Sequence, residues 1–367
     1  MKYKFLVALA CVFAISTTSC NSDEPAAPVP DNSFNVNVVD WGDVPVQDIV
    51  LSASIPDASP RSRVSDVNGF HGNGLNVNTL RYCIYKDDAT KTIVQTDEDV
   101  APTATASNTW IVRATLAAGV KYKVFFWADY AKTYDVDFTA HTVTADYAKT
   151  LDMVDFADAF CSLYDFSIDS GTNNGSLKVS LKRPFAQVCV LSRELDSEAM
   201  LALYPKTPYT FFGFTKSKEP NNLYLPNSWN FMDDTFTVAS RLLSTTNTWI
   251  GSPNVTRTIN GTTVKAASKV TYQGKEYKYV YMSFIFAPSF EQLGMDNYAM
   301  EFYSDEGVTR KGSYRSSGLT PSLTPNTRLI FISDADGSND EPSFFFGGTN
   351  FTIVKSSDFD EDIIQSM

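Results

Sequence analysis

Side chains that could carry chemistry are scarce in this chain, because it contains only two histidines. His71 lies in a glycine-rich turn, 69–74, that lacks the length and the lysine of a phosphate-binding loop. His141 is interpreted, like His71, as a surface or hydrogen-bonded residue. No Gly-x-Ser-x-Gly nucleophile motif is present, and the many carboxylates cannot be paired as acid and base without a fold. We therefore predict that the protein is not an enzyme and uses no cofactor.

An acidic segment, 334–341, carries enough oxygen atoms to bind calcium. Its spacing is not that of an EF-hand loop, since Gly337 directly follows the second aspartate, Asp336. An acidic turn between two strands explains the segment better. We therefore predict no metal site.

Aromatic residues and prolines are dense between Tyr204 and Phe231. Two interpretations stay open. Exposed rings could stack on sugars, with Tyr224 and Trp229 as the candidate glycan contacts. Alternatively, the segment is a long loop packed over a sandwich, and its rings form part of the core.

Length and composition favour a folded protein of about two domains. The chain has 367 residues, of which 43% are hydrophobic and 20% charged, so it can build large cores and is not disordered. Its formal net charge of −12 argues against nucleic acid as a partner, because phosphate binding needs a clustered basic surface.

The first twenty residues have the pattern of a secretion signal. Lys2 and Lys4 precede an apolar run, 5–15, that is too short to span a bilayer. The small residues before Cys20 resemble the lipobox of bacterial lipoproteins, although Thr17 stands where a larger apolar residue is commoner. The resemblance implies a signal peptide over 1–19, then cleavage and acylation, with palmitate, at Cys20.

The residues after Cys20 indicate where the lipoprotein would reside. Asp23 and Glu24 form an acidic pair like the surface-export signal of Bacteroidetes lipoproteins, and prolines then make a semi-rigid tether within 20–45. We therefore predict a surface-exposed lipoprotein of the outer membrane, held there by its lipid anchor.

Three cysteines, Cys83, Cys161 and Cys189, remain beyond the anchor, so at least one thiol is unpaired. Cys83 and Cys189 lie in strand-like contexts, which favours small buried hydrophobes. One disulfide in an exported protein stays an alternative, and the sequence does not choose the pair.

Most of the remaining chain has the pattern of short strands bounded by Gly, Pro, Asn and Asp. Two hairpins are predicted, one pairing 110–116 with 121–128 and one pairing 264–272 with 277–286. Helices are predicted only over 148–159 and 196–204. The other predicted strands are 49–55, 78–85, 177–182, 186–191, 329–333, 344–346 and 350–354.

Many short strands separated by turn signals predict an all-β fold of sandwich domains. The polar loop 170–176 is the best boundary between domains. It divides the chain into an N-terminal β-sandwich, 46–174, and a C-terminal β-sandwich, 175–355, followed by an acidic tail, 356–367, that is expected to fray.

Two strand blocks are recognisable. The block 121–129, KYKVFFWAD, resembles the strand that crosses the first domain of fimbrillin-like proteins of the Bacteroidales. The block 177–188, LKVSLKRPFAQV, resembles the strand pair that opens their second domain. The chain is most similar to a fimbrillin-related lipoprotein family that shares the Lys-Arg-Pro-Phe-Ala block. The resemblance implies two transthyretin-like β-sandwich domains and a role in type V fimbriae.

The same resemblance implies assembly by donor-strand exchange. An arginine-specific protease removes the first strand, and a strand from another fimbrial subunit fills the groove by β-augmentation. The removable strand would be 49–55, with Arg63 as first and Arg61 as second candidate cleavage site. The segment 350–354 is the candidate incoming strand, whereas the acidic tail suits a groove poorly, which leaves a tip or an anchor as alternatives to a stalk.

The expected function is therefore a structural or adhesive component of type V fimbriae, located on the outer membrane or in the fimbrium. Its partners would be other fimbrial subunits and a host or bacterial surface receptor. The alternative is a surface glycan-binding lipoprotein that uses aromatic platforms on its sandwich domains.

Overall fold

The computed structural model describes residues 41–55, 72, 74, 76–103, 108–147, 156–169, 176–193, 209–240, 256–259, 262–265, 269–272, 274–288, 290–303, 310–333, 352–357 and 361–365. All of these residues belong to one compact unit, Val36–Met367. Nearly every element in them is a strand, and the single turn of helix α4 (Phe290–Leu293) is the exception among the named elements. The predicted all-β fold is confirmed.

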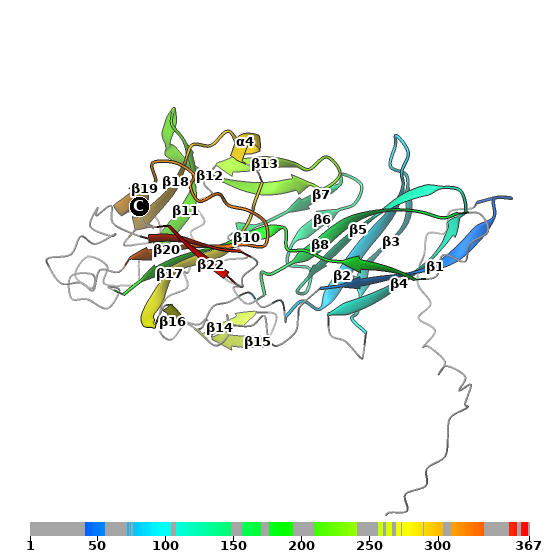
Figure 1. Cartoon of the computed structure of the whole chain (residues 1–367), viewed down its shortest axis with the longest axis horizontal. Coiled ribbons are helices and arrows are strands. Elements are labelled where there is room, and N and C mark those ends of the chain that lie inside the picture. The colour runs from blue at the N-terminus through cyan, green and yellow to red at the C-terminus, as the bar shows by residue number, and fades with distance from the viewer. Residues whose placement is uncertain are drawn as a thin grey trace, which may run out of the picture. The chain divides into compact units, whose positions relative to one another are not determined.

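Two sheets pack against each other in the N-terminal part (Figure 1). Apolar residues alternate along β1 and β4, whereas β2 and β5 are apolar on both faces, so the latter pair takes the centre of its sheet. The three-stranded sheet has the order β4 (Thr109–Ala117), β1 (Val46–Ser54), β9 (Ser176–Ser180). The four-stranded sheet has the order β3 (Ile93–Val100), β2 (Thr79–Lys86), β5 (Lys121–Asp129), β8 (Phe160–Ser167).

Two larger sheets form the C-terminal part. One has the order β16 (Lys269–Tyr272), β17 (Lys275–Phe286), β10 (Phe185–Ser192), β20 (Arg328–Ser333), β21 (Thr352–Ser357), β22 (Glu361–Gln365). The other has the order β19 (Arg310–Arg315), β18 (Asn297–Tyr303), β11 (Tyr209–Lys216), β12 (Glu219–Asn230), β7 (Thr142–Thr144), β6 (Asp135–Asp137), with β13 (Thr235–Ser240) also on β12. A separate hairpin joins β14 (Thr256–Ile259) and β15 (Thr262–Lys265).

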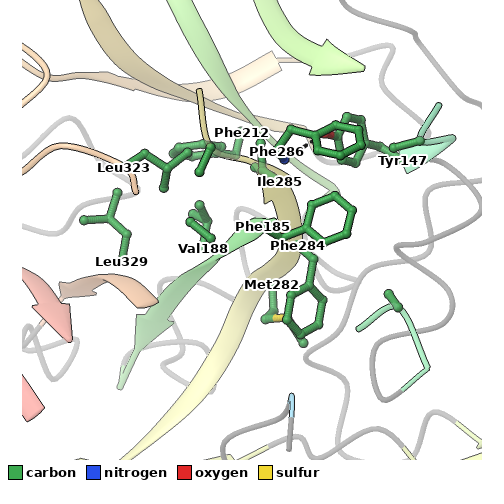
Figure 2. Close-up of a cluster of buried hydrophobic side chains, with 14 of the residues drawn as sticks. Tyr147, Phe185, Val188, Phe212, Met282, Phe284, Ile285, Phe286, Leu323 and Leu329 are labelled. Atoms are coloured by element: carbon green, nitrogen blue, oxygen red, sulfur yellow. Dashed lines mark hydrogen bonds between the residues drawn. The ribbon is translucent and has the colours of Figure 1, made fainter. Parts of the chain in front are cut away.

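The core between these two sheets is rich in aromatic side chains. Figure 2 shows part of it, with Phe212 of β11 and Ile285 of β17. Tyr147 extends the cluster, because its hydroxyl accepts a hydrogen bond of 3.2 Å from the Phe286 amide. Val188 of β10 is fully buried in the same core, as expected for a central strand.

Strand pairing crosses the predicted boundary at residue 174 in both directions. β9 follows the boundary but pairs in parallel with β1, and β7 precedes it but pairs with β12. Packing crosses it as well, because Phe125 of β5 stacks on Phe231 with ring centroids 3.7 Å apart. Phe125 therefore joins the C-terminal core, while its neighbour Phe126 faces the N-terminal one.

One predicted hairpin is confirmed and the other is wrong. β16 and β17 pair tightly, with Tyr272 opposite Lys275 and Gly274 at φ +75° in the turn. β4 and β5 do not pair, because β5 lies between β2 and β8 in the opposite sheet. The short link around Gly119 (φ +76°) thus carries the chain from one sheet to the other.

Several other expectations differ from the structure or lie outside the described residues. β9 and β10 belong to different sheets and are not a strand pair. The acidic tail forms a strand, β22, paired with β21. The helices predicted over 148–159 and 196–204 and the strand 344–346 fall wholly or mostly outside the described residues, as do His71 and the acidic segment 334–341.

Candidate functional site

The first strand, β1, occupies the middle of its sheet. It is antiparallel to β4 along its whole length, from Val46 opposite Ala117 to Ser54 opposite Thr109. On its other side it is parallel to β9, from Val50 opposite Ser176 to Ser54 opposite Ser180. Because both edges of β1 are paired, its removal would open the hydrogen-bonding edges of two strands at once.

The inward face of β1 supplies much of the local core. Ile49, Leu51 and Ala53 are each 1% exposed or less, and Ile55 continues the series just beyond the strand. These alternate side chains belong to one cluster with Trp110 of the neighbouring strand. Removal of β1 would leave an apolar groove between β4 and β9. A strand that fills this groove is stabilised mainly by the burial of apolar surface, which contributes a free energy of about 25 cal/mol per Å².

Polar contacts fix the ends and the outer face of β1. The Thr115 hydroxyl donates to the Asp48 carboxylate at 2.6 Å, and the Gln47 amide donates to the Asp169 carbonyl at 3.0 Å. At the other end, the Ile55 amide donates to the Asn108 carbonyl at 3.1 Å. These contacts lie near the rim and are exposed or backbone-mediated, so they add to a register that the buried alternate side chains of β1 specify.

A buried ion pair holds the chain at residue 72, beyond the segment that follows β1. The Arg183 guanidinium donates to both carboxylate oxygens of Asp158, at 2.6 and 2.7 Å, and to the Gly72 carbonyl at 3.0 Å. It also donates to Asn326 at 2.7 Å and lies 4.6 Å from the centre of the Phe160 ring. One side chain therefore ties together four separate segments of the chain.

Gly72 is required at this junction by both its conformation and its surroundings. Its φ is +92°, a region that favours glycine. A Cβ atom there would lie 2.7 Å from Cζ of Phe284 and 2.9 Å from Nε2 of Gln187. The chain thus approaches the C-terminal core closely at this residue.

A second buried ion pair, Arg81 with Asp129, lies within the four-stranded sheet. The two side chains approach to 2.6 Å, and the Trp127 indole donates to the same carboxylate at 3.1 Å. Burial raises the pKa of Asp129, an effect that Arg81 opposes. Sequence reasoning missed this pair and the one at Arg183, although a charged residue next to a long apolar run was a usable signal.

The residues predicted to carry lipidation and cleavage cannot be placed. Cys20, Arg61 and Arg63 lie outside the described residues. The two arginines follow β1 in the chain and precede the anchored residue Gly72. Their predicted roles therefore stay predictions, with only their order relative to β1 fixed.

The two candidate glycan contacts lie on β12 and are both engaged by protein groups. The Tyr224 hydroxyl bonds to the Glu219 carboxylate, which raises the pKa of Tyr224, and the Lys216 ammonium lies 5.1 Å from the ring centre. Trp229 is half-buried, stacks on Phe236 at 6.0 Å, and donates from its indole to another side chain, Asp234. Both rings therefore already contact other protein side chains. The glycan-binding hypothesis stays a prediction.

Cys83, Cys161 and Cys189 are free and buried. Burial raises the pKa of both Cys83 and Cys189 to about 12, and raises that of Cys161 as well. These thiols are small apolar side chains of the core, as predicted, and they form no disulfide.

This burial makes the thiols unreactive in the folded protein. In a chain without residues 1–20, iodoacetamide at pH 8 is expected to label none of the three, because almost no thiolate is present. The same reagent in guanidinium chloride should add three labels, counted by intact mass. Rapid labelling of the native protein at Cys83 or Cys189 would contradict the described packing.

Within the described ranges, no group of three or more His, Cys, Asp or Glu side chains is arranged to hold a metal ion. A search of the same ranges finds no helix of sufficient length and hydrophobicity to cross a membrane.

The fold and the paired first strand define an all-β sandwich protein. The chain belongs to a family of unknown function, DUF6562, whose model matches residues 43–314. No curated protein matches it.

Several solved structures are similar to the chain. The fimbrial anchor protein Mfa2 from Porphyromonas gingivalis is 11% identical with a TM-score of 0.43, over 88% of this chain and 100% of that one. A fimbrial assembly protein from Parabacteroides distasonis is 10% identical with a TM-score of 0.37, over 88% and 99%. A Bacteroides thetaiotaomicron protein of proposed polysaccharide binding is 9% identical with a TM-score of 0.44, over 88% and 98%.

Proposed function

We propose that the protein is a surface lipoprotein and a structural or adhesive component of type V fimbriae, without catalytic activity. It is anchored through acylated Cys20 in the outer membrane and is activated for assembly by cleavage at Arg63 or Arg61. Cleavage releases β1, and a strand from another fimbrial subunit takes its place.

The observation that carries this proposal is the position of β1. It is the first strand of the described chain, it is paired on both sides, and its alternate side chains fill a core. Both candidate arginines follow β1 in the sequence and precede Gly72, whose carbonyl accepts a hydrogen bond from Arg183. A cut between these points would leave β1 held only by non-covalent contacts.

The sequence resemblances support the same proposal independently of the fold. The small residues before Cys20 and the acidic pair behind it fit a surface lipoprotein, and the strand blocks 121–129 and 177–188 resemble fimbrillin-like proteins. Other fimbrial subunits are the partners that this proposal requires. A surface receptor is a further partner that an adhesive role would require.

Removing both candidate cleavage sites should stop assembly. When the Arg61→Ala/Arg63→Ala double variant is expressed in the native host, surface assemblies resistant to mild denaturant should be lost from gels. The matched control is Arg113→Ala, because Arg113 is an exposed arginine within β4. An undiminished ladder of assemblies from the double variant would contradict protease-triggered exchange.

A further inference from the structure

β1 occupies a groove lined on one side by β4. The buried side chains of β4 that face this groove increase in size from Ala114 through Val112 to Trp110. On the buried face, each β1 residue is opposite one residue of β4, and the sizes of the two are complementary. The pairs are Ile49 with Ala114, Leu51 with Val112, and Ala53 with Trp110. A large side chain thus lies opposite a small one at both ends of the series.

The Trp110 end of the groove is the most restrictive position. Trp110 is fully buried, and Ala53 opposite it is fully buried too. Val179 is the other neighbour of Ala53, across the parallel pairing with β9. Since the core is close-packed, a larger side chain at this position has no space without displacing the indole.

The Ala114 end of the groove accepts a large side chain for the same reason. Ala114 leaves room that Ile49 fills, and Ile49 is only 1% exposed. The order of sizes along β1 is therefore set by β4 and would apply to any strand that replaced β1 in the same direction.

We propose that the groove selects its incoming strand by this order of sizes. The partner is an extended segment of another subunit, parallel to β9 and antiparallel to β4. It carries a large aliphatic residue, a second aliphatic residue two positions later, and alanine or serine two positions after that. This inference rests on the proposed function, because it names the partner that the exchanged site would accept.

Serine suits the third position because it is nearly as small as alanine and because the residue opposite, Trp110, has a buried donor. The indole N–H of Trp110 has no hydrogen-bond acceptor among the described residues. A serine hydroxyl on the incoming strand would bring an acceptor to the position next to this residue, whereas alanine only fits the space.

The first test uses the intact mature chain and does not depend on cleavage. Ala53→Leu should lower the urea midpoint of unfolding, while Ala53→Ser should not. Trp110→Leu in the Ala53→Leu background should raise the midpoint again, because two leucines together have nearly the volume of the original alanine and tryptophan. An Ala53→Leu chain as stable as the original would overturn the proposed order.

The second test replaces residues 57–63 with the recognition sequence of a site-specific protease. The chain is cut and β1 is displaced by labelled peptides of residues 46–55, read by fluorescence anisotropy. Peptides with Ala or Ser at position 53 should bind, and a peptide with Leu there should bind roughly tenfold to hundredfold more weakly.

The outcomes distinguish size selection at the groove from strand exchange itself. If the Ala, Ser and Leu peptides bind equally, size selection is wrong while strand exchange survives. If no peptide binds, including the native sequence, then the proposed strand exchange at this groove is wrong, and so is the proposed size selection. If only a peptide of reversed sequence binds, the proposed direction of the incoming strand is wrong.

Discussion

Replacing Arg183 with methionine is expected to cost about 3–5 kcal/mol of unfolding free energy, because it leaves the Asp158 carboxylate buried without its partner. Both side chains of the pair are 7% exposed or less. The variant also loses the hydrogen bonds to Gly72 and Asn326. Chemical denaturation followed by tryptophan fluorescence would measure the loss.

Two further variants distinguish the ion pair from simple packing. Arg183→Met combined with Asp158→Leu should recover part of the stability, since no charge then stays buried. Lys123→Met is the matched control, because its 2.5 Å contact is with Asp165, whose side chain is 70% exposed. That loss should be about 1 kcal/mol or less. An Arg183→Met chain no less stable than the Lys123→Met control would show that the pair contributes little.

Phe125→Ala is expected to destabilise the protein by about 3–5 kcal/mol, as large-to-small changes of buried aromatic residues do. Phe125 is fully buried and stacks on Phe231 at an interplanar angle of 3°. It also meets Trp229 edge-on at 6.1 Å, so the substitution leaves a cavity next to three aromatic rings. Because β5 and Phe231 lie on either side of residue 174, the variant should lower the stability of both parts together.

The control for this variant lies on the adjacent strand. Leu163 of β8 is directly opposite Phe125 in the register but is 37% exposed. Leu163→Ala should therefore cost about 1 kcal/mol or less, in a single unfolding transition. Two separate transitions in Phe125→Ala, with only one of them shifted, would show that the two parts are not coupled through this stack.

Strands and tight turns could be predicted from the sequence, but their partners often could not. The pair β16 and β17 was predicted from a Gly-containing turn between two strand patterns. The link between β4 and β5 has the same local signals, and yet it joins two sheets. β4 alternates while β5 is apolar on both faces, which indicates that β5 is a central strand but does not identify its two neighbours.

Buried charges were the other limit of sequence reasoning. Arg183 and Asp158 are separated by 25 residues, and Arg81 and Asp129 by 48, so no local pattern links them. The candidate site was predictable in part. The strand 49–55 was predicted from the sequence, and its alternate side chains are buried. Its position between β4 and β9 is evident only from the structure. Cys20, Arg61 and Arg63 are still sequence predictions.

The most direct test of strand release is the N-terminus of the protein taken from the cell surface. Mass spectrometry of the assembled fraction should find chains that begin at Ser62 or Val64, with β1 absent from the same polypeptide. Chains in that fraction that still begin at acylated Cys20 would contradict release of the first strand. They would leave an uncut anchor, a tip adhesin or a glycan-binding lipoprotein as the account of this protein.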